Sequence, residues 1–316
     1  MFLSLLLFLA GTVPAADGVP IHYSVQGKGE PALVFIHCWS CDRHLWESQV
    51  RVFAKTNRVV TIDLPGHGES GKGRKNWSVA GFGEDVKRVV TKLGLKRVVL
   101  IGSSMGGPVA LEAALLMPER VVAIVPVDTL HNVDQRLPAE QVEAVLKQIG
   151  GDYKGQTTGF MNQYMFAPST PAAVKERMLT QVTSLPQDIG LPILRAVMTY
   201  DPIPALQKIK VPILAINADM NPTNLEGNRK HAPQFDVVIM KGVGHYPMLE
   251  DPARFNELLS VILRNLSKSR AGFNPRRAPM QSTAASMAMN VERPFLRRSE
   301  HFLVRRNLAE HLGGTR

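Results

Sequence analysis

The stretch that decides the fold is residues 97–117, RVVLIGSSMGGPVALEAALLM. Residues 98–101 are apolar and mostly β-branched, which is typical of a strand that is buried on both faces. The pattern Gly102-x-Ser104-x-Gly106 follows directly, and residues 108–117 have the composition of a helix. A strand, a tight turn and a helix in immediate succession predict that Ser104 lies in a strained turn with its hydroxyl exposed at the helix start.

Outward from this motif, short apolar segments alternate with helical periods along most of the chain. The expected strands are residues 32–37, 58–63, 97–102, 121–128, 212–217 and 236–240. Helical periods lie between several of them, for example at residues 79–93. This alternation predicts an α/β fold, in which a mostly parallel sheet is flanked by helices.

The alternation stops between residues 131 and 210. Apolar residues from Val142 to Ile149 recur with the spacing of one helical face, and prolines interrupt the rest of the stretch. We therefore expect residues 131–210 to form a helical lid inserted into the core. The core itself would consist of residues 16–130 and 211–267.

The two ends of the chain differ from its body. Residues 1–15 contain a short apolar run followed by Val13-Pro14-Ala15, which predicts a cleaved signal peptide and export to the periplasm or the medium. Without such a signal the protein would be cytoplasmic. The apolar run is too short to span a bilayer, so no stable membrane insertion is expected.

Basic residues are concentrated at the C-terminal end. Residues 268–316 hold 10 Lys and Arg against 3 Asp and Glu, whereas the whole chain of 316 residues has a net charge of +10. The tail also has little periodicity, which predicts a basic, disordered appendage. Because the body is nearly neutral, no nucleic acid is expected as a partner.

A serine nucleophile requires a base. His245 lies in residues 242–247, GVGHYP, directly after the last expected strand. The two glycines give a loop that can bring the imidazole over Ser104. The order of serine first and histidine near the end of the core also fits a nucleophile at a strand–helix turn.

Two further segments complete the pattern, namely residues 34–39 (VFIHCW) and 63–70 (DLPGHGES). With the Ser104 turn and the GVGH loop they resemble signatures of the α/β-hydrolase superfamily, over about residues 18–267. The resemblance implies an α/β-hydrolase fold and a serine enzyme that acts on a small molecule without a cofactor. The two cysteines and scattered histidines do not form a metal-site pattern, and we expect a monomer.

The resemblance also implies an oxyanion hole made by the backbone N–H groups of Trp39 and Met105. Cys38 stands where the family usually has glycine, which places a Cβ atom in a tight loop. Cys38 and Cys41 form a C-x-x-C pair. We expect two unpaired thiols, with a structural disulfide and a redox-active pair as alternatives.

Two aspartates are candidates for the acid that orients His245. In most of the superfamily the acid follows the next-to-last strand, where this chain has Asn221. Asp219, two residues earlier, would lie on the same side of an extended chain. Asp128 ends the strand 121–128, the position that a minority of the superfamily uses. The sequence leaves both aspartates open.

These residues predict a serine hydrolase that cleaves a small ester or related acyl compound through an acyl-enzyme intermediate. The same residues would also serve a carbon–carbon bond hydrolase, a thioesterase or a perhydrolase. A non-catalytic small-molecule receptor with a vestigial triad is a further alternative, because Cys38 and Asn221 both depart from the family pattern.

Overall fold

The computed structural model describes residues 8–268, and within them the chain builds one sheet of eight strands. The strands are β1 (Phe8–Pro14), β2 (Pro20–Gln26), β3 (Ala32–Ile36), β4 (Val59–Ile62), β5 (Val98–Ser103), β6 (Val121–Val127), β7 (Ile213–Ala218) and β8 (Phe235–Met240). Their order across the sheet is β1-β2-β4-β3-β5-β6-β7-β8. β1 and β2 are antiparallel to their neighbours, and all the other pairs are parallel. The predicted α/β-hydrolase fold is confirmed.

Helices cover both faces of this sheet. One face packs against α1 (Glu47–Phe53) and α11 (Pro252–Lys268), and the other against α2 (Val79–Lys92), α3 (Gly106–Leu116) and α8 (Ile203–Lys208). Alternate side chains of one strand enter the two cores: Phe35 of β3 joins the first, and Val34 joins the second. Side chains of a strand alternate between faces, so a strand covered on both faces must be apolar throughout.

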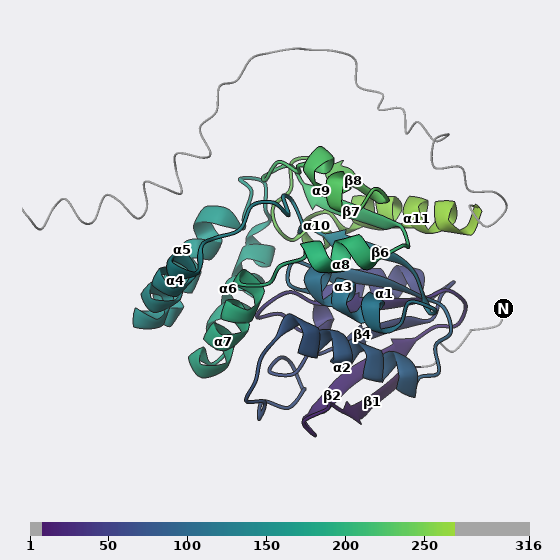
Figure 1. Cartoon of the computed structure of the whole chain (residues 1–316), viewed down its shortest axis with the longest axis horizontal. Coiled ribbons are helices and arrows are strands. Elements are labelled where there is room, and N and C mark those ends of the chain that lie inside the picture. Colours follow the sequence, from purple (N-terminus) through teal and green to yellow (C-terminus); the bar gives the residue numbers. More distant parts are fainter. Residues whose placement is uncertain (1–7, 269–316) are drawn as a thin grey trace, which may run out of the picture. The chain divides into compact units, whose positions relative to one another are not determined.

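The stretch expected as a lid consists of helices. It contains α4 (Ala139–Gly151), α5 (Tyr153–Tyr164), α6 (Ala172–Ser184), α7 (Gln187–Met198) and α8. Figure 1 shows α4 to α7 gathered beside the sheet, while α8 contacts α3 of the core. We call residues 131–210 the helical insertion. Short helices complete the described part: η1 (Arg43–Trp46), α9 (Leu225–His231) and α10 (Pro247–Glu250).

Part of the segment expected as a signal peptide forms a strand in the structure. Phe8–Pro14 pairs along its whole length with β2 as the edge strand β1, and Ala15 is buried. The sheet therefore begins before the predicted core boundary at residue 16. An edge strand tolerates the terminal Pro14 because one of its sides makes no ladder hydrogen bonds.

A buried ion-pair network ties the turn after β1 to the core. Arg74 donates to Asp17 at 2.8 Å and to Asp85 of α2 at 2.6 Å, and its side chain is only 5% exposed. These contacts fix the N-terminal hairpin against α2.

The predicted basic tail lies outside the described residues, apart from Lys268 at the end of α11. No helix between residues 8 and 268 is long and apolar enough to cross a membrane.

Candidate active site

Ser104 lies in the sharp turn between β5 and α3. Its φ angle is +50°, a conformation that residues with a side chain rarely adopt. A Cβ atom at Gly102 would collide with the carbonyl oxygen of Gly106, and one at Gly106 would lie 2.5 Å from the carbonyl oxygen of Ile36. Both positions therefore require glycine, and the close packing that they allow holds Ser104 in its strained, half-buried position.

The backbone of Ser104 lies beside the end of β6. Its N–H donates to the carbonyl oxygen of Val127 at 2.9 Å. Asp128, the next residue after Val127, leaves the sheet with a φ angle of +46° and a buried carboxylate. The turn after β5 and the turn after β6 are therefore adjacent at the carboxyl edge of the sheet.

Asp128 and His245 form a hydrogen-bonded pair. The Nδ1 atom of His245 is 2.6 Å from Oδ2 of Asp128, and the histidine side chain is 14% exposed. An imidazole that donates Nδ1–H to a carboxylate keeps its Nε2 atom as an acceptor. That tautomer is the one a general base needs, so this pair can take a proton from a neighbouring hydroxyl.

A second histidine contacts the same carboxylate. His131 Nε2 lies 3.2 Å from Oδ1 of Asp128, and the backbone N–H of Ala218 donates to that oxygen at 2.8 Å. Burial acts to raise the pKa of Asp128, but the hydrogen bonds from His131 and His245 outweigh it and hold the pKa well below its ordinary value. Asp128 therefore stays ionised beside His245 at neutral pH.

Asp219 has a different environment. Its Oδ1 atom accepts a hydrogen bond from the N–H of Gly242 at 2.9 Å. The contact braces the loop that leads to His245, but no contact joins Asp219 to the imidazole. Within the described residues the structure thus brings Asp128, and not Asp219, to His245.

The loop that carries His245 is fixed by Glu250 and by the helical insertion. Glu250 accepts hydrogen bonds from the N–H groups of Gly244 (2.8 Å) and Tyr246 (3.1 Å), and from the hydroxyl of Thr170 (2.6 Å). The N–H of His245 donates to the carbonyl oxygen of Met165 at 2.8 Å. Residues of the insertion thus help to set the position of the histidine.

The loop after β3 lies against the start of α3. A Cβ atom on Gly106 would lie 2.9 Å from the carbonyl oxygen of His37, so this loop closely approaches the turn that carries Met105. Trp39 is half-buried, and its indole N–H donates to the carbonyl oxygen of Gly190 in α7 at 3.0 Å. The backbone of Trp39 thus lies in the loop that directly adjoins the start of α3.

The cysteines of this loop are paired. Cys38 and Cys41 form a disulfide with their Cα atoms 5.3 Å apart, which corrects the expectation of two unpaired thiols. The tight turn between them brings the N–H of Cys41 to the carbonyl oxygen of Cys38 at 3.1 Å, and so places both side chains within bonding reach. Both residues are buried.

His67 supports the loop after β4 from inside the core. Its Nδ1 atom lies 3.2 Å from the carbonyl oxygen of Pro65, and its ring packs 4.9 Å from that of His37. Burial, with a smaller contribution from neighbouring His37, lowers the pKa of His67 to about 3. A buried neutral ring with these contacts has a structural role.

Comparison with known proteins identifies the family. The model of the alpha/beta hydrolase family matches residues 33–258. The chain belongs to this family. It is therefore a hydrolase, and the mostly parallel sheet with its flanking helices is the family's fold in this protein.

Relatives of this hydrolase carry esterase names. It is 27% identical over 258 residues to a pimeloyl-[acyl-carrier protein] methyl ester esterase of Pectobacterium atrosepticum, covering 75% of this chain and 96% of the relative. Among solved structures, an esterase from Exiguobacterium antarcticum superposes with a TM-score of 0.73 at 21% identity, covering 81% of this chain and 100% of that one. Est816, an N-acyl homoserine lactone degrading enzyme, gives a TM-score of 0.67 at 27% identity, covering 79% and 99%.

Two residues of the site were missed by sequence reasoning. His131 had no motif around it, and only the turn after Asp128 brings it back to the carboxylate. Glu250 follows His245 by five residues. A carboxylate shortly after a glycine-rich loop could have suggested an acceptor for the free N–H groups of that loop.

Among residues 8–268 no group of three His, Cys, Asp or Glu side chains is arranged to hold a metal ion.

Proposed function

We propose that this hydrolase is a serine esterase in which Ser104 is the nucleophile, His245 the general base and Asp128 the acid that orients His245. The observation that carries the proposal is the 2.6 Å contact between His245 and Asp128, at the sheet edge where the turn holds Ser104. Asp219 has no role in catalysis in this account, and braces the loop through Gly242.

The proposed reaction proceeds in two halves. Nε2 of His245 takes the proton of the Ser104 hydroxyl while its oxygen attacks the ester carbonyl carbon. The N–H groups of Trp39 and Met105 stabilise the resulting oxyanion. His245 then gives the proton to the leaving alcohol, and a water activated by the same imidazole releases the acid from the acyl-enzyme.

The substrate is a small ester. The names of the relatives reported above support an ester bond as the target, since one is a methyl ester esterase and another degrades a lactone, which is a cyclic ester. In our proposal the helical insertion is a lid over the ester. It contacts both the loop of Trp39 and the loop of His245, so it borders the reacting groups from two sides.

The compartment is also a proposal. The Cys38–Cys41 disulfide supports an oxidising location, because disulfides are rare in reducing cytoplasm. Export through a cleavage after residue 15 would remove β1 from the sheet. We therefore infer that an exported form retains residues 8–15 as part of the folded domain.

The test is hydrolysis of p-nitrophenyl acetate, butyrate and octanoate by the full chain. Ser104→Ala is compared with Ser103→Ala, a matched control, because Ser103 is the adjacent serine and its buried hydroxyl has no hydrogen-bond partner among residues 8–268. We expect turnover by the unaltered protein and by Ser103→Ala, and loss of at least about 1,000-fold in Ser104→Ala. Equal rates for Ser104→Ala and the unaltered protein would refute the proposal. Turnover of a diketone without any ester hydrolysis would favour a carbon–carbon bond hydrolase.

A further inference from the structure

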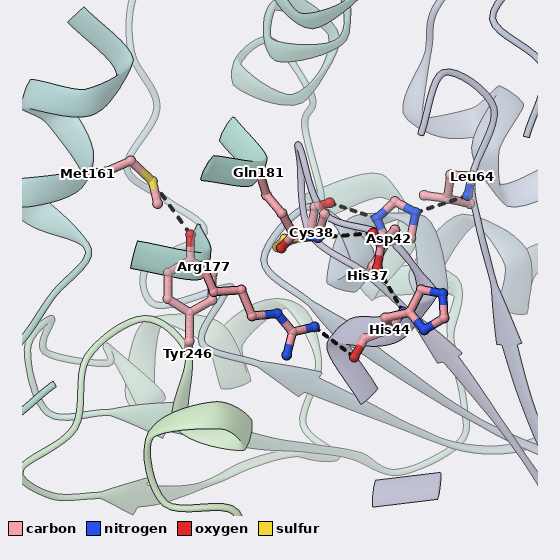
Figure 2. The surroundings of a disulfide bond; sticks show 10 residues. His37, Cys38, Asp42, His44, Leu64, Met161, Arg177, Gln181 and Tyr246 are labelled. Atoms are coloured by element: carbon pink, nitrogen blue, oxygen red, sulfur yellow. Dashed lines mark hydrogen bonds between the residues drawn. A yellow bond between two sulfur atoms is a disulfide. The ribbon is translucent and has the colours of Figure 1, made fainter. Parts of the chain in front are cut away.

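The peptide group between Cys38 and Trp39 is held from its carbonyl side. The oxygen of Cys38 lies 2.7 Å from Nδ1 of His37 and also accepts the N–H of Cys41 at 3.1 Å. The other ring nitrogen of His37 accepts the N–H of Leu64 at 3.0 Å. The ring therefore links the loop after β3 to the loop after β4 through hydrogen bonds (Figure 2). Burial lowers the pKa of His37, which keeps the ring neutral and suits one donor and one acceptor.

Fixing this carbonyl also fixes the N–H of Trp39. The peptide bond is planar and trans, so its N–H points opposite to its C=O. The oxygen of Cys38 is directed toward His37 and Cys41, and the Trp39 N–H must therefore point away from them. In the proposed mechanism that N–H is one of the two oxyanion donors, and its direction matters for catalysis.

The disulfide closes the same turn covalently. It joins the residue before Trp39 to the residue two positions after it, and both cysteines are 2% exposed. Between them Ser40 is buried and has a φ angle of +62°. Such a backbone persists only where its surroundings impose it, and the disulfide is a covalent constraint on that turn.

The helical insertion contacts this loop both within the disulfide-closed turn and after it. Within the turn, the Trp39 side chain donates to Gly190 of α7. After it, Gln181 of α6 donates to the carboxylate of Asp42 at 3.0 Å, and Arg177 donates to the carbonyl oxygen of His44 at 2.9 Å (Figure 2). Movement of the insertion would therefore act on the loop, and the disulfide ties together the chain between these contacts.

We propose that the Cys38–Cys41 disulfide is a positioning element that holds the Trp39 N–H in its oxyanion geometry. This inference rests on the proposed function. Loss of one oxyanion donor lowers turnover by about 100- to 1,000-fold in serine hydrolysis, and a displaced donor costs less than a missing one. Breaking the disulfide is therefore expected to lower kcat about 10- to 100-fold and to leave KM within about 3-fold, because ground-state binding does not use this donor.

The disulfide is broken in two ways in the full chain. Dithiothreitol attacks one sulfur, the S–S bond breaks, and the dithiol supplies two electrons and two protons to the cysteines while it closes to its own cyclic disulfide. Alkylation and mass spectrometry measure the fraction reduced. The double variant Cys38→Ala/Cys41→Ala breaks the bond permanently, and adding dithiothreitol to it is the matched control. The rate of p-nitrophenyl butyrate hydrolysis is measured in each case.

Hydrogen exchange at the Trp39 amide gives a second readout that does not need turnover. We expect exchange to become at least 10-fold faster when the disulfide is broken, kcat to fall as stated, and reoxidation to restore both. The reagent should have no effect on the double variant. If that variant does not fold, the reduced and reoxidised natural protein provides the same comparison.

The outcomes separate the two proposals. Unchanged kcat and unchanged Trp39 exchange after complete reduction would overturn the positioning role. So would a rise in KM with kcat preserved, because that pattern belongs to substrate binding. If the oxidised protein shows no Ser104-dependent turnover, the esterase proposal fails, and Trp39 exchange alone then decides whether the disulfide holds this peptide group.

Discussion

The Oδ2 atom of Asp128 lies 2.6 Å from Nδ1 of His245, although 117 positions separate the two residues in the chain. Asp128 directly follows β6 and His245 lies in the loop after β8, with β7 between the two strands in the sheet. The pairing follows from parallel strands whose carboxyl ends meet at one edge. It makes Asp128 the acid of the proposed triad, and the consequences of that assignment can be measured.

Asp128→Asn is expected to lower kcat about 1,000- to 10,000-fold, because an amide neither selects the required tautomer of His245 nor stabilises its protonated form. Asp219→Asn is the matched control. Its side-chain oxygen can still accept the N–H of Gly242, so activity should stay close to that of the unaltered protein. Ester hydrolysis by the two purified variants decides the matter, and a larger loss in Asp219→Asn would contradict the assignment.

Glu250→Ala is expected to lower kcat about 10-fold and to reduce thermal stability. The change removes the acceptors for the N–H groups of Gly244 and Tyr246, which flank His245, and hydrogen bonds to a charged group contribute about 1.5–3 kcal/mol each. Glu257→Gln on the exposed face of α11 is the control and should behave like the unaltered protein. Full activity of Glu250→Ala would show that the loop holds His245 without this carboxylate.

His67→Phe is expected to make the protein less sensitive to mild acid. The unfolded chain protonates this histidine near pH 6.5, whereas burial lowers the folded pKa to about 3. As the pH falls below 6.5 only the unfolded state gains the proton, so stability is lost. The unfolding free energy that is lost in this way between pH 7 and pH 5 is about 2 kcal/mol. Urea unfolding at pH 7 and pH 5 should show that His67→Phe loses less unfolding free energy than the unaltered protein, by that amount. An equal loss of unfolding free energy in both proteins would contradict the lowered pKa of His67.

A chain that begins at Ala16 is expected to be less stable than the full chain, because it lacks β1. Tyr23 and Val25 of β2, both buried, would lose their neighbours on the edge side. Thermal unfolding of the two purified forms checks this prediction, with the Asp17–Arg74 contact present in both. Identical unfolding temperatures would mean that the domain does not need β1.

Most of the fold could be predicted from local sequence. The strands β3 to β7 are mainly apolar segments, and their pattern identifies them because both faces are buried. β8 is also mainly apolar, although it is an edge strand with several exposed or half-buried residues. β1 and β2 lack such a pattern. A run such as Phe8–Pro14 has the length and composition of a leader, and only pairing with β2 makes it a strand. Edge strands depend on non-local partners, which one sequence does not reveal.

The candidate site was predictable only where a motif fixes the geometry. Ser104 and His245 sit in glycine turns with a characteristic composition, so the sequence placed both at the sheet edge. The choice between Asp128 and Asp219 depends on the conformation of two turns that carry no such pattern. The same holds for Cys38 and Cys41, which are joined across a turn in which Ser40 has a positive φ.

The most direct test of the central claim is covalent labelling with a fluorophosphonate, followed by mass spectrometry of the peptides. We expect one adduct per chain, on Ser104, and expect labelling to be strongly slowed in Asp128→Asn but not in Asp219→Asn. No adduct, or an adduct on Ser103 or another residue instead of Ser104, would contradict the assignment of the nucleophile.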